Sequence, residues 1–285
     1  MPKRLAVLGQ PVSHSRSPAM HNAGLAELGL ADEWSYEAIE VAPDHFAARI
    51  RAMPREGFVG ANVTVPHKLA ALALADMASE PARAIGAANT LSFAGGRVAA
   101  DNTDATGFLD AILRLPEGGR ALVLGAGGSA RAVVWALVTH GAEVAIWNRT
   151  PAGAERLAGE FGARVAKPNR ADGVLPTGHQ DLIVNATTVG MGTSSGQPAD
   201  LRSLPIDADA LGEKHQLVDL AYGAAETELV RAARARGAHV IDGLEVLVRQ
   251  GAASLRIWTG LDPPIEAMRR AARATTWQTK SDPDT

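Results

Sequence analysis

The sequence predicts an α/β fold with mostly parallel sheets, divided into two lobes. Short apolar runs alternate with longer helix-like stretches along almost the whole chain. The length of 285 residues suits one large domain or two of ordinary size. A turn-rich break at Leu115–Gly119 separates a helix-like stretch from a fresh apolar run, so we expect the first lobe to end there.

The expected strands are short apolar runs of the kind found in parallel strands that are buried on both faces. They are Leu5–Leu8, Ala121–Leu124, Val144–Trp147 and Leu182–Val184. The expected helices are Pro18–Leu28, Asp44–Met53, Ala130–Thr139, Glu226–Arg236 and, after a second crossover at Asp242–Gly243, Leu244–Trp258. The polar end of the chain, Thr275–Thr285, is expected to fray.

Composition excludes several classes of protein. A net charge of −3 argues against a surface for nucleic acid or anionic membrane. The chain has no cysteine, which excludes disulfides, thiolate zinc sites, iron–sulfur clusters and cysteine nucleophiles. The run Leu5–Leu8 is too short for a signal peptide, and no stretch approaches the roughly 20 apolar residues of a membrane-spanning helix. We therefore expect a soluble, cytoplasmic protein.

A glycine-rich turn follows the expected strand Ala121–Leu124 and opens the next helix. The turn fits the pattern G-x-G-x-x-G/A with Ala130 in the third place. Its glycines allow a tight turn and close backbone approach, and the helix N-terminus then faces a pyrophosphate. This placement predicts a dinucleotide site, with contacts from Gly125, Ala126, Gly127, Gly128 and Ser129.

The next strand ends at Asn148-Arg149-Thr150, where a fold selective for NAD usually carries an acidic residue for the ribose. No acid stands here. Arg149 can pair with a 2′-phosphate, while Asn148 and Thr150 supply hydrogen-bonding groups. The alternative is an exposed arginine beside a helix cap, because Thr150-Pro151 is also a good helix start. The pattern favours NADP over NAD.

Serines mark the junction after the first expected strand. Ser15 and Ser17 precede a helix, and their hydroxyls together with free backbone N–H groups can hold a carboxylate. Helix capping by Ser17 ahead of Pro18 is the alternative, and it leaves Ser15 unexplained.

A lysine and an aspartate are the candidates for proton transfer. Asn62 and Thr64 share one face of a strand that runs into a helix near Pro66. Lys68 then falls in the first helical turn, where the helix dipole disfavours a cation. Paired with Asp104 across a cleft, it would form a proton-transfer couple. The alternatives are a surface lysine and a helix cap within Asp101–Asp104.

Other catalytic patterns are absent from the sequence. The eight histidines show no HExxH or comparable spacing, so we expect no metal site. No G-x-S-x-G nucleophile elbow occurs.

Taken together, these motifs resemble the shikimate dehydrogenase family, over nearly the whole chain from Gly9 to Gln250. The family's signatures occur in order as Gly9–Pro18, Asn62–Lys68, Ala88–Leu91, Asp101–Asp104, the glycine turn, Asn148–Thr150, Asn185–Thr187 and Gly243–Gln250. So many ordered motifs are far more specific than a glycine turn alone.

The resemblance implies NADPH-dependent reduction of 3-dehydroshikimate to shikimate by a monomer or homodimer. It implies an open α/β substrate domain, residues 1–115 with 243–285, and a Rossmann-type doubly wound NADP domain, residues 116–242, with a cleft between them that closes on ligands. Lys68 matches the catalytic lysine, held in place by Asp104. By position, Ser15 and Ser17 would hold the substrate carboxylate, with ring contacts from Thr64, Asn89, Asp104 and Gln250 and with Tyr222 close by. Further cofactor contacts would come from Glu80, Leu220 and Gly243.

Two departures from the family pattern bear on the cofactor and the substrate loop. The glycine that usually precedes Asp101 is Ala100, and the second basic residue of many NADP-using members is Gly153. Phosphate recognition would therefore depend mainly on Arg149.

Two rival functions remain at this point. One is a quinate/shikimate dehydrogenase that uses NAD, whose members often carry threonine where this chain has Ser17. The other is a catalytically silent protein that binds NADP or shikimate, although Lys68 and Asp104 are both present.

Overall fold

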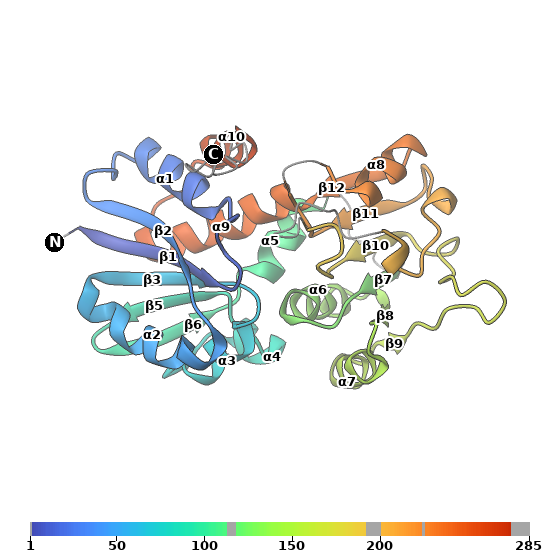
Figure 1. Cartoon of the computed structure of the whole chain (residues 1–285), viewed down its shortest axis with the longest axis horizontal. Helices are drawn as coiled ribbons and strands as arrows, with labels where there is room; N and C mark the ends of the chain where they lie inside the picture. The colour runs from blue at the N-terminus through green and yellow to red at the C-terminus, as the bar shows by residue number, and fades with distance from the viewer. Residues whose placement is uncertain (1, 113–117, 192–200, 224–225, 275–285) are drawn as a thin grey trace, which may run out of the picture.

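The computed structural model describes residues 2–112, 118–191, 201–223 and 226–274. It contains two six-stranded sheets, one on each side of the molecule (Figure 1). The first sheet is built from strands β1–β6 and the second from β7–β12. The α/β prediction is therefore confirmed.

The first sheet has the strand order β2-β1-β3-β5-β6-β4. Its strands are β1 (Lys3–Gly9), β2 (Trp34–Glu40), β3 (Phe58–Val63), β4 (Met77–Ala78), β5 (Thr90–Ala94) and β6 (Arg97–Asp101). β5 runs antiparallel to both β3 and β6. Gly95 and Gly96, both with positive φ, join β5 to β6 in a tight hairpin.

Helices cover both faces of the first sheet because alternate residues of β1 are buried in opposite layers. Leu5 and Val7 pack against α1 (Ser17–Glu27), α9 (Gly243–Thr259) and α10 (Ile265–Ala274). Ala6 and Leu8 face the layer of α2 (Phe46–Ala52) and α3 (Lys68–Ala73). The C-terminal helices α9 and α10 thus pack on the sheet that the N-terminal part of the chain forms (Figure 1).

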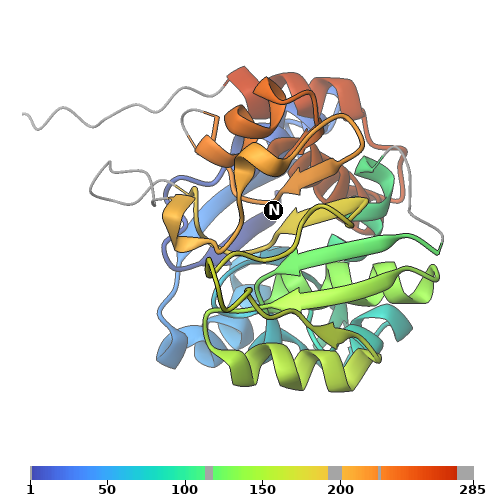
Figure 2. The same ribbon diagram turned by 90° about the vertical axis from the view of Figure 1, so that its right-hand side faces the viewer.

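The second sheet is wholly parallel, in the order β12-β11-β10-β7-β8-β9. Counted from β7, this is the doubly wound order of dinucleotide-binding folds. Figure 2 faces this lobe, with its strands one above another. The strands are β7 (Arg120–Leu124), β8 (Glu143–Trp147), β9 (Arg164–Val165), β10 (Leu182–Asn185), β11 (Gln216–Asp219) and β12 (His239–Asp242). The other helices are α4 (Glu80–Ile85), α5 (Asp104–Ala111), α6 (Gly128–Thr139), α7 (Pro151–Phe161) and α8 (Glu228–Ala235).

The predicted elements all occur, with ends that differ by at most two residues. The stretch Asp44–Met53 is divided between a 3₁₀ turn at Pro43–His45, α2, and a second 3₁₀ turn at Met53–Glu56. The expected lobe boundary lies partly, and the expected frayed tail wholly, outside the described residues. Within the described ranges, no helix is long and apolar enough to cross a membrane.

Candidate active site

A cavity of about 230 Å³ lies between the two lobes and takes side chains from both. Its wall includes the loop after β1, the end of β3, the starts of α3, α5 and α6, one face of α9, and the loops after β10 and β11. The expected site residues that line it are Ser15, Ser17, Thr64, Lys68, Asn89, Asp104, Ser129, Leu220, Tyr222, Gly243 and Gln250. Motifs far apart in the sequence therefore meet in one place.

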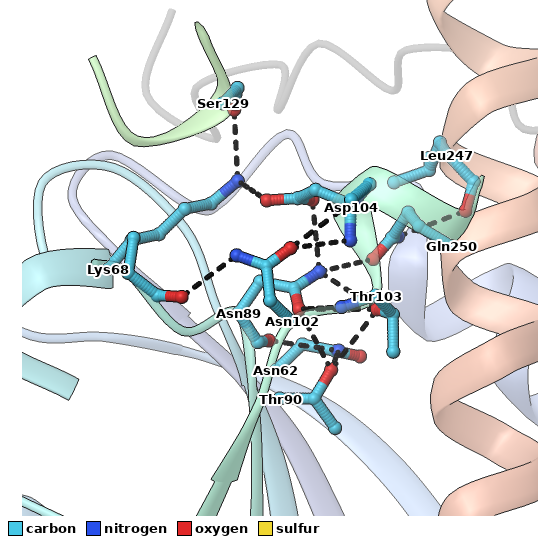
Figure 3. Close-up of polar contacts among 12 residues, drawn as sticks. Asn62, Lys68, Asn89, Thr90, Asn102, Thr103, Asp104, Ser129, Leu247 and Gln250 are labelled. Carbon is cyan, nitrogen blue, oxygen red and sulfur yellow. Dashed lines mark hydrogen bonds and ion pairs between the residues drawn. The ribbon is translucent and has the colours of Figure 1, made fainter. Parts of the chain in front are cut away.

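Lys68 and Asp104 form a buried ion pair in this cavity (Figure 3). They are the first residues of α3 and α5, and the lysine Nζ donates to Asp104 Oδ2 over 2.7 Å. Their side chains are only 9% and 16% exposed, so little water competes for this charge-assisted bond. The lysine Nζ also donates to Ser129 Oγ over 2.9 Å.

Asn89 links the ion pair to α9. Its Nδ2 lies 2.9 Å from Asp104 Oδ1 and 3.0 Å from Gln250 Oε1. Its Oδ1 accepts the backbone N–H of Thr103 over 2.7 Å. Because Gln250 also donates to Leu247 O, its side-chain orientation is fixed from both sides. Carboxylate, amides and ammonium thus present several donors and acceptors to one small volume.

A second polar layer next to the cavity includes Tyr36 and Ser254, which the sequence patterns did not single out. Asn62 donates to Ser254 Oγ over 2.9 Å and accepts from the Tyr36 hydroxyl over 2.8 Å. Ser254 also lies 2.9 Å from Thr90 Oγ1. Gln250 and Ser254 stand one turn apart on a buried face of α9, and two polar residues at helical spacing on an apolar face are the pattern that identifies such a layer.

The serine cluster differs from the capping alternative. The helix α1 begins at Ser17, and Arg16 occupies its N-cap position. The Arg16 side chain makes no capping hydrogen bond to the helix. Ser15 Oγ accepts the Ser17 N–H over 3.2 Å, so capping by Ser17 is wrong because Ser15 satisfies that turn instead. Both serines line the cavity.

Arg16 and Tyr222 close this end of the cavity. The Arg16 guanidinium is buried and donates from Nη2 to Gly223 O over 3.3 Å, while its Nη1 has no hydrogen-bond partner among the described residues. Burial raises the pKa of Tyr222, against the opposing effects of a hydrogen bond with Ser15 and the charge of Arg16. The sequence showed Arg16 inside the motif, but a basic residue before a helix is usually exposed, and no role was inferred for it.

A buried carboxylate organises the loop that carries Tyr222. Asp219, the last residue of β11, accepts from Asn185 Nδ2 over 2.8 Å, from Ala221 N over 3.1 Å and from Thr227 Oγ1 over 2.6 Å. Burial raises the pKa of Asp219 to about 6, the neighbouring Asp242 adding to the effect. These bonds hold the segment that forms one wall of the cavity.

The glycine turn lies beside the cavity at the carboxyl edge of the second sheet. Gly125 has φ +113°, and a Cβ there would lie 2.9 Å from Ala186 O, so only glycine fits. A Cβ at Gly127 would meet nothing within 4 Å, which leaves open space at the N-terminus of α6. That space, backbone N–H groups and a helix N-terminus together fit a dinucleotide phosphate.

The remaining expected cofactor residues lie outside the cavity wall. Asn148, Arg149 and Thr150 follow β8, which pairs with β7, so they share an edge with the glycine turn. Arg149 is exposed, and Asn148 Nδ2 donates to Thr150 O. Glu80 is exposed at the start of α4 and is not brought to the cavity.

Comparison with known proteins gives three family matches along the chain. The shikimate dehydrogenase substrate binding domain matches residues 7–91, shikimate / quinate 5-dehydrogenase matches residues 111–193, and the shikimate 5′-dehydrogenase C-terminal domain matches residues 243–273.

Individual relatives agree over nearly full length. The shikimate dehydrogenase (NADP(+)) of one Thermus thermophilus strain is 45% identical over 95% of this chain and 97% of its own. The shikimate dehydrogenase (NADP(+)) of Paracoccus denitrificans is 43% identical over 94% of this chain and 95% of its own length. The crystal structure of the enzyme from a second T. thermophilus strain, in complex with NADP(H) and shikimate, superposes with a TM-score of 0.82, at 44% identity over 96% of this chain and 99% of that one. The chain therefore belongs to the shikimate dehydrogenase family.

Proposed function

We propose that this protein catalyses the reversible, NADP-dependent reduction of 3-dehydroshikimate to shikimate. The observation that carries the proposal is the buried Lys68–Asp104 pair, set in a cavity that both lobes line. Taking two charges out of water costs stability. A silent binding protein would gain nothing in return from a lysine buried against a carboxylate.

The substrate would bind with its carboxylate at the serine end of the cavity and its ring at the lysine end. Ser15 and Ser17 would hold the carboxylate, with Tyr222 beside it. Thr64, Asn89, Asp104 and Gln250 would contact the ring hydroxyls. The network through Asn89 supports this assignment, since it fixes amide and carboxylate orientations before any ligand arrives.

Lys68 would manage the single proton of the reaction. When bound, NADPH supplies the hydride that reduces the carbonyl carbon. The Lys68 ammonium would donate a proton to the carbonyl oxygen, leaving a neutral amine and a hydroxyl group. Asp104 would hold the lysine in place throughout. In the reverse direction, the neutral amine would accept the proton of the shikimate hydroxyl.

The cofactor would lie along the carboxyl edge of the second sheet. Its pyrophosphate would contact backbone N–H groups of the turn formed by Gly125, Ala126, Gly127, Gly128 and Ser129. Arg149 would pair with the 2′-phosphate, flanked by Asn148 and Thr150, because it is an exposed cation beside the turn. Leu220 and Gly243 would border the nicotinamide from the cavity wall.

We retain residues 1–115 with 243–285 as the proposed substrate domain and 116–242 as the proposed NADP domain. The packing of α9 and α10 on the first sheet supports this division. The cytoplasmic location and the monomeric or homodimeric state stay predictions.

The test measures absorbance of the reduced nicotinamide while the protein oxidises shikimate or quinate with NADP or NAD, in all four pairings. We expect strong activity with shikimate and NADP alone. A preference for quinate or NAD would move the protein to the rival branch. Silence in all four pairings, with ligand binding intact, would overturn the proposed activity.

A further inference from the structure

Ser129 stands between the glycine turn and the ion pair. It is the second residue of α6, its side chain lines the cavity, and its Oγ accepts from Lys68 Nζ over 2.9 Å (Figure 3). The contact joins residues 61 positions apart, one on α3 of the first lobe and one on the first turn of α6 in the second. The family resemblance implies that the cofactor lies along this turn; in the structure, the Ser129 hydroxyl bonds to the lysine.

The lysine stem is fitted to the same turn. A Cβ at Gly128 would lie 3.0 Å from both Cβ and Cδ of Lys68, closer than ordinary contact allows without adjustment. The aliphatic chain of Lys68 therefore lies directly over Gly128. This packing holds the ammonium within hydrogen-bond distance of both Ser129 and Asp104.

The contact matters because it uses one of the few hydrogen-bond donors that the ammonium has. A lysine ammonium has three N–H donors and no acceptor. Asp104 Oδ2 accepts one and Ser129 Oγ accepts a second. The third remains for the cavity, which Lys68, Asp104 and Ser129 all line.

We propose that Ser129 is a positioning residue for Lys68: by accepting one ammonium hydrogen from across the cleft, it fixes the donor that the lysine presents to the substrate. The proposal rests on the proposed function. It also links the proton transfer to the approach of the lobes, because the bond forms only when α6 lies against α3.

The effect of removing the hydroxyl has a definite sign. A hydrogen bond from a charged donor is stronger than one from a neutral amine, so Ser129 favours the ammonium form. The other titratable groups at the cavity are Asp104, in contact with Lys68, and His14, Arg16 and Tyr222 in its wall. His67, next to Lys68 in the chain, turns away and bonds to Val41 O. Of the titratable groups named here, Lys68 is the one that bonds to Ser129.

The first test follows the lysine directly by NMR. The lysines of the chain are Lys3, Lys68, Lys167, Lys214 and Lys280, so spectra of ¹³C-lysine-labelled protein are sparse and Lys68→Ala identifies the Lys68 signal. In Ser129→Ala we expect the Lys68 Cε signal to change its position, because the ammonium loses one of the two acceptors that hold it. Ser129→Thr, which keeps the hydroxyl, should restore the signal. An unmoved signal in Ser129→Ala overturns the proposal, whatever the activity of the protein.

The second test separates positioning of the lysine from contact with the cofactor. For shikimate oxidation we expect Ser129→Ala to lower kcat about 10-fold and to move the acid limb of its pH profile downward, with the KM for NADP within about twofold. A raised KM for NADP with an unmoved profile would make Ser129 a cofactor contact and overturn the inference. Ser35→Ala, an exposed serine on β2, is the matched control and should change nothing. An inactive wild type, together with a moved Lys68 signal in Ser129→Ala, would overturn the proposed function and leave the positioning of Lys68 standing.

Discussion

The proposed chemistry depends on side chains that are held in place before a ligand binds. Lys68 and Asp104 each begin a helix, and both are fixed by neighbours: Ser129 bonds the lysine and Asn89 bonds the aspartate. Helix starts are useful positions for such groups, since the backbone there is rigid while the side chain projects toward the sheet edge. Substitutions of Lys68, of Arg149 and of the buried Asp219 should therefore have different effects.

Lys68→Ala should lower kcat by about 10²- to 10⁴-fold with little change in the KM for shikimate, because general acid–base catalysis contributes that range. Steady-state kinetics in both directions measure it. Lys214→Ala removes an exposed lysine that bonds to Gly178 O, and is the control. Unchanged turnover in Lys68→Ala would contradict the role given to this lysine.

Arg149→Ala should lower kcat/KM for NADP about 10- to 100-fold, the effect of losing one or two charge-assisted bonds to the phosphate. The value for NAD should change far less, because NAD lacks the 2′-phosphate. Gly153 offers no second cation, so no neighbour in α7's first turn compensates. Arg51→Ala, an exposed arginine on α2, controls for net charge. Equal losses with both cofactors would contradict 2′-phosphate recognition by Arg149.

Asp219→Asn should change how stability depends on pH. The pKa of Asp219 rises from an ordinary 3.8 to about 6 on folding, so the folded protein holds this proton more tightly than the unfolded chain. The stability that comes from this proton is complete below about pH 4 and is lost as the pH rises through 6, a change of about 3 kcal/mol. Asparagine keeps an acceptor for Asn185 and a donor for Thr227 but does not titrate.

Urea unfolding between pH 4 and 7 measures this difference. Relative to Asp219→Asn, the wild type should lose stability as the pH rises across that window. Asp262→Asn, in an exposed ion pair with Arg256, is the control for the loss of one carboxylate. A constant difference for Asp219→Asn would contradict a raised pKa.

Among the elements, sequence patterns predicted strands that are buried along most of their length. They did not predict the two strands of the hairpin, whose pairing depends on a tight turn. β1, β7, β8 and β10 are buried along most of their length and appear as unbroken apolar runs. β5 and β6 do not, because their hairpin depends on positive φ at Gly95 and Gly96 and both strands mix polar and apolar residues. The expected strands did not include this antiparallel pair, which matters because β5 begins next to Asn89 and β6 ends shortly before Asp104.

The packing of α5 on α9 gives a prediction at the element scale. Gly107 lets the two helices approach so closely that a Cβ there would lie 2.4 Å from Gln250 N. Gly107→Ala should therefore lower the free energy of unfolding by about 1–3 kcal/mol. It should also raise the KM for shikimate, because α9 and Gln250 must move away from Asn89.

Gly159→Ala is the matched control for this pair of helices. Gly159 lies within α7, where a Cβ would meet nothing within 4 Å. That variant should gain about 0.5–1 kcal/mol from helix propensity and keep its kinetics. If the two glycine variants behaved alike, the close approach of α5 and α9 would not be needed for the site.

For the molecule as a whole, the sequence predicted two lobes and most of the residues that meet between them, because ordered family motifs specify positions that local patterns cannot. It did not predict which contacts cross from one lobe to the other. Those contacts include Lys68 with Ser129, Arg16 with Gly223 O, and Arg131 Nε with Ile85 O over 2.6 Å. They depend on the relative position of two separate sheets, which no stretch of sequence encodes locally.

These three contacts lead to the prediction that the lobes close on their ligands. Both lobes line the cavity, and Arg16 and Lys68 reach across it, so separation of the lobes would widen the path for substrate and cofactor. A ligand that touches both walls then favours the closed arrangement by its differential affinity. In small-angle X-ray scattering we expect the radius of gyration to fall when shikimate and NADP are present together, and to fall less with either alone. An identical radius with no ligand, one ligand and both would mean that the lobes are fixed, and entry would then have to occur through movement of the cavity's loops after β10 and β11.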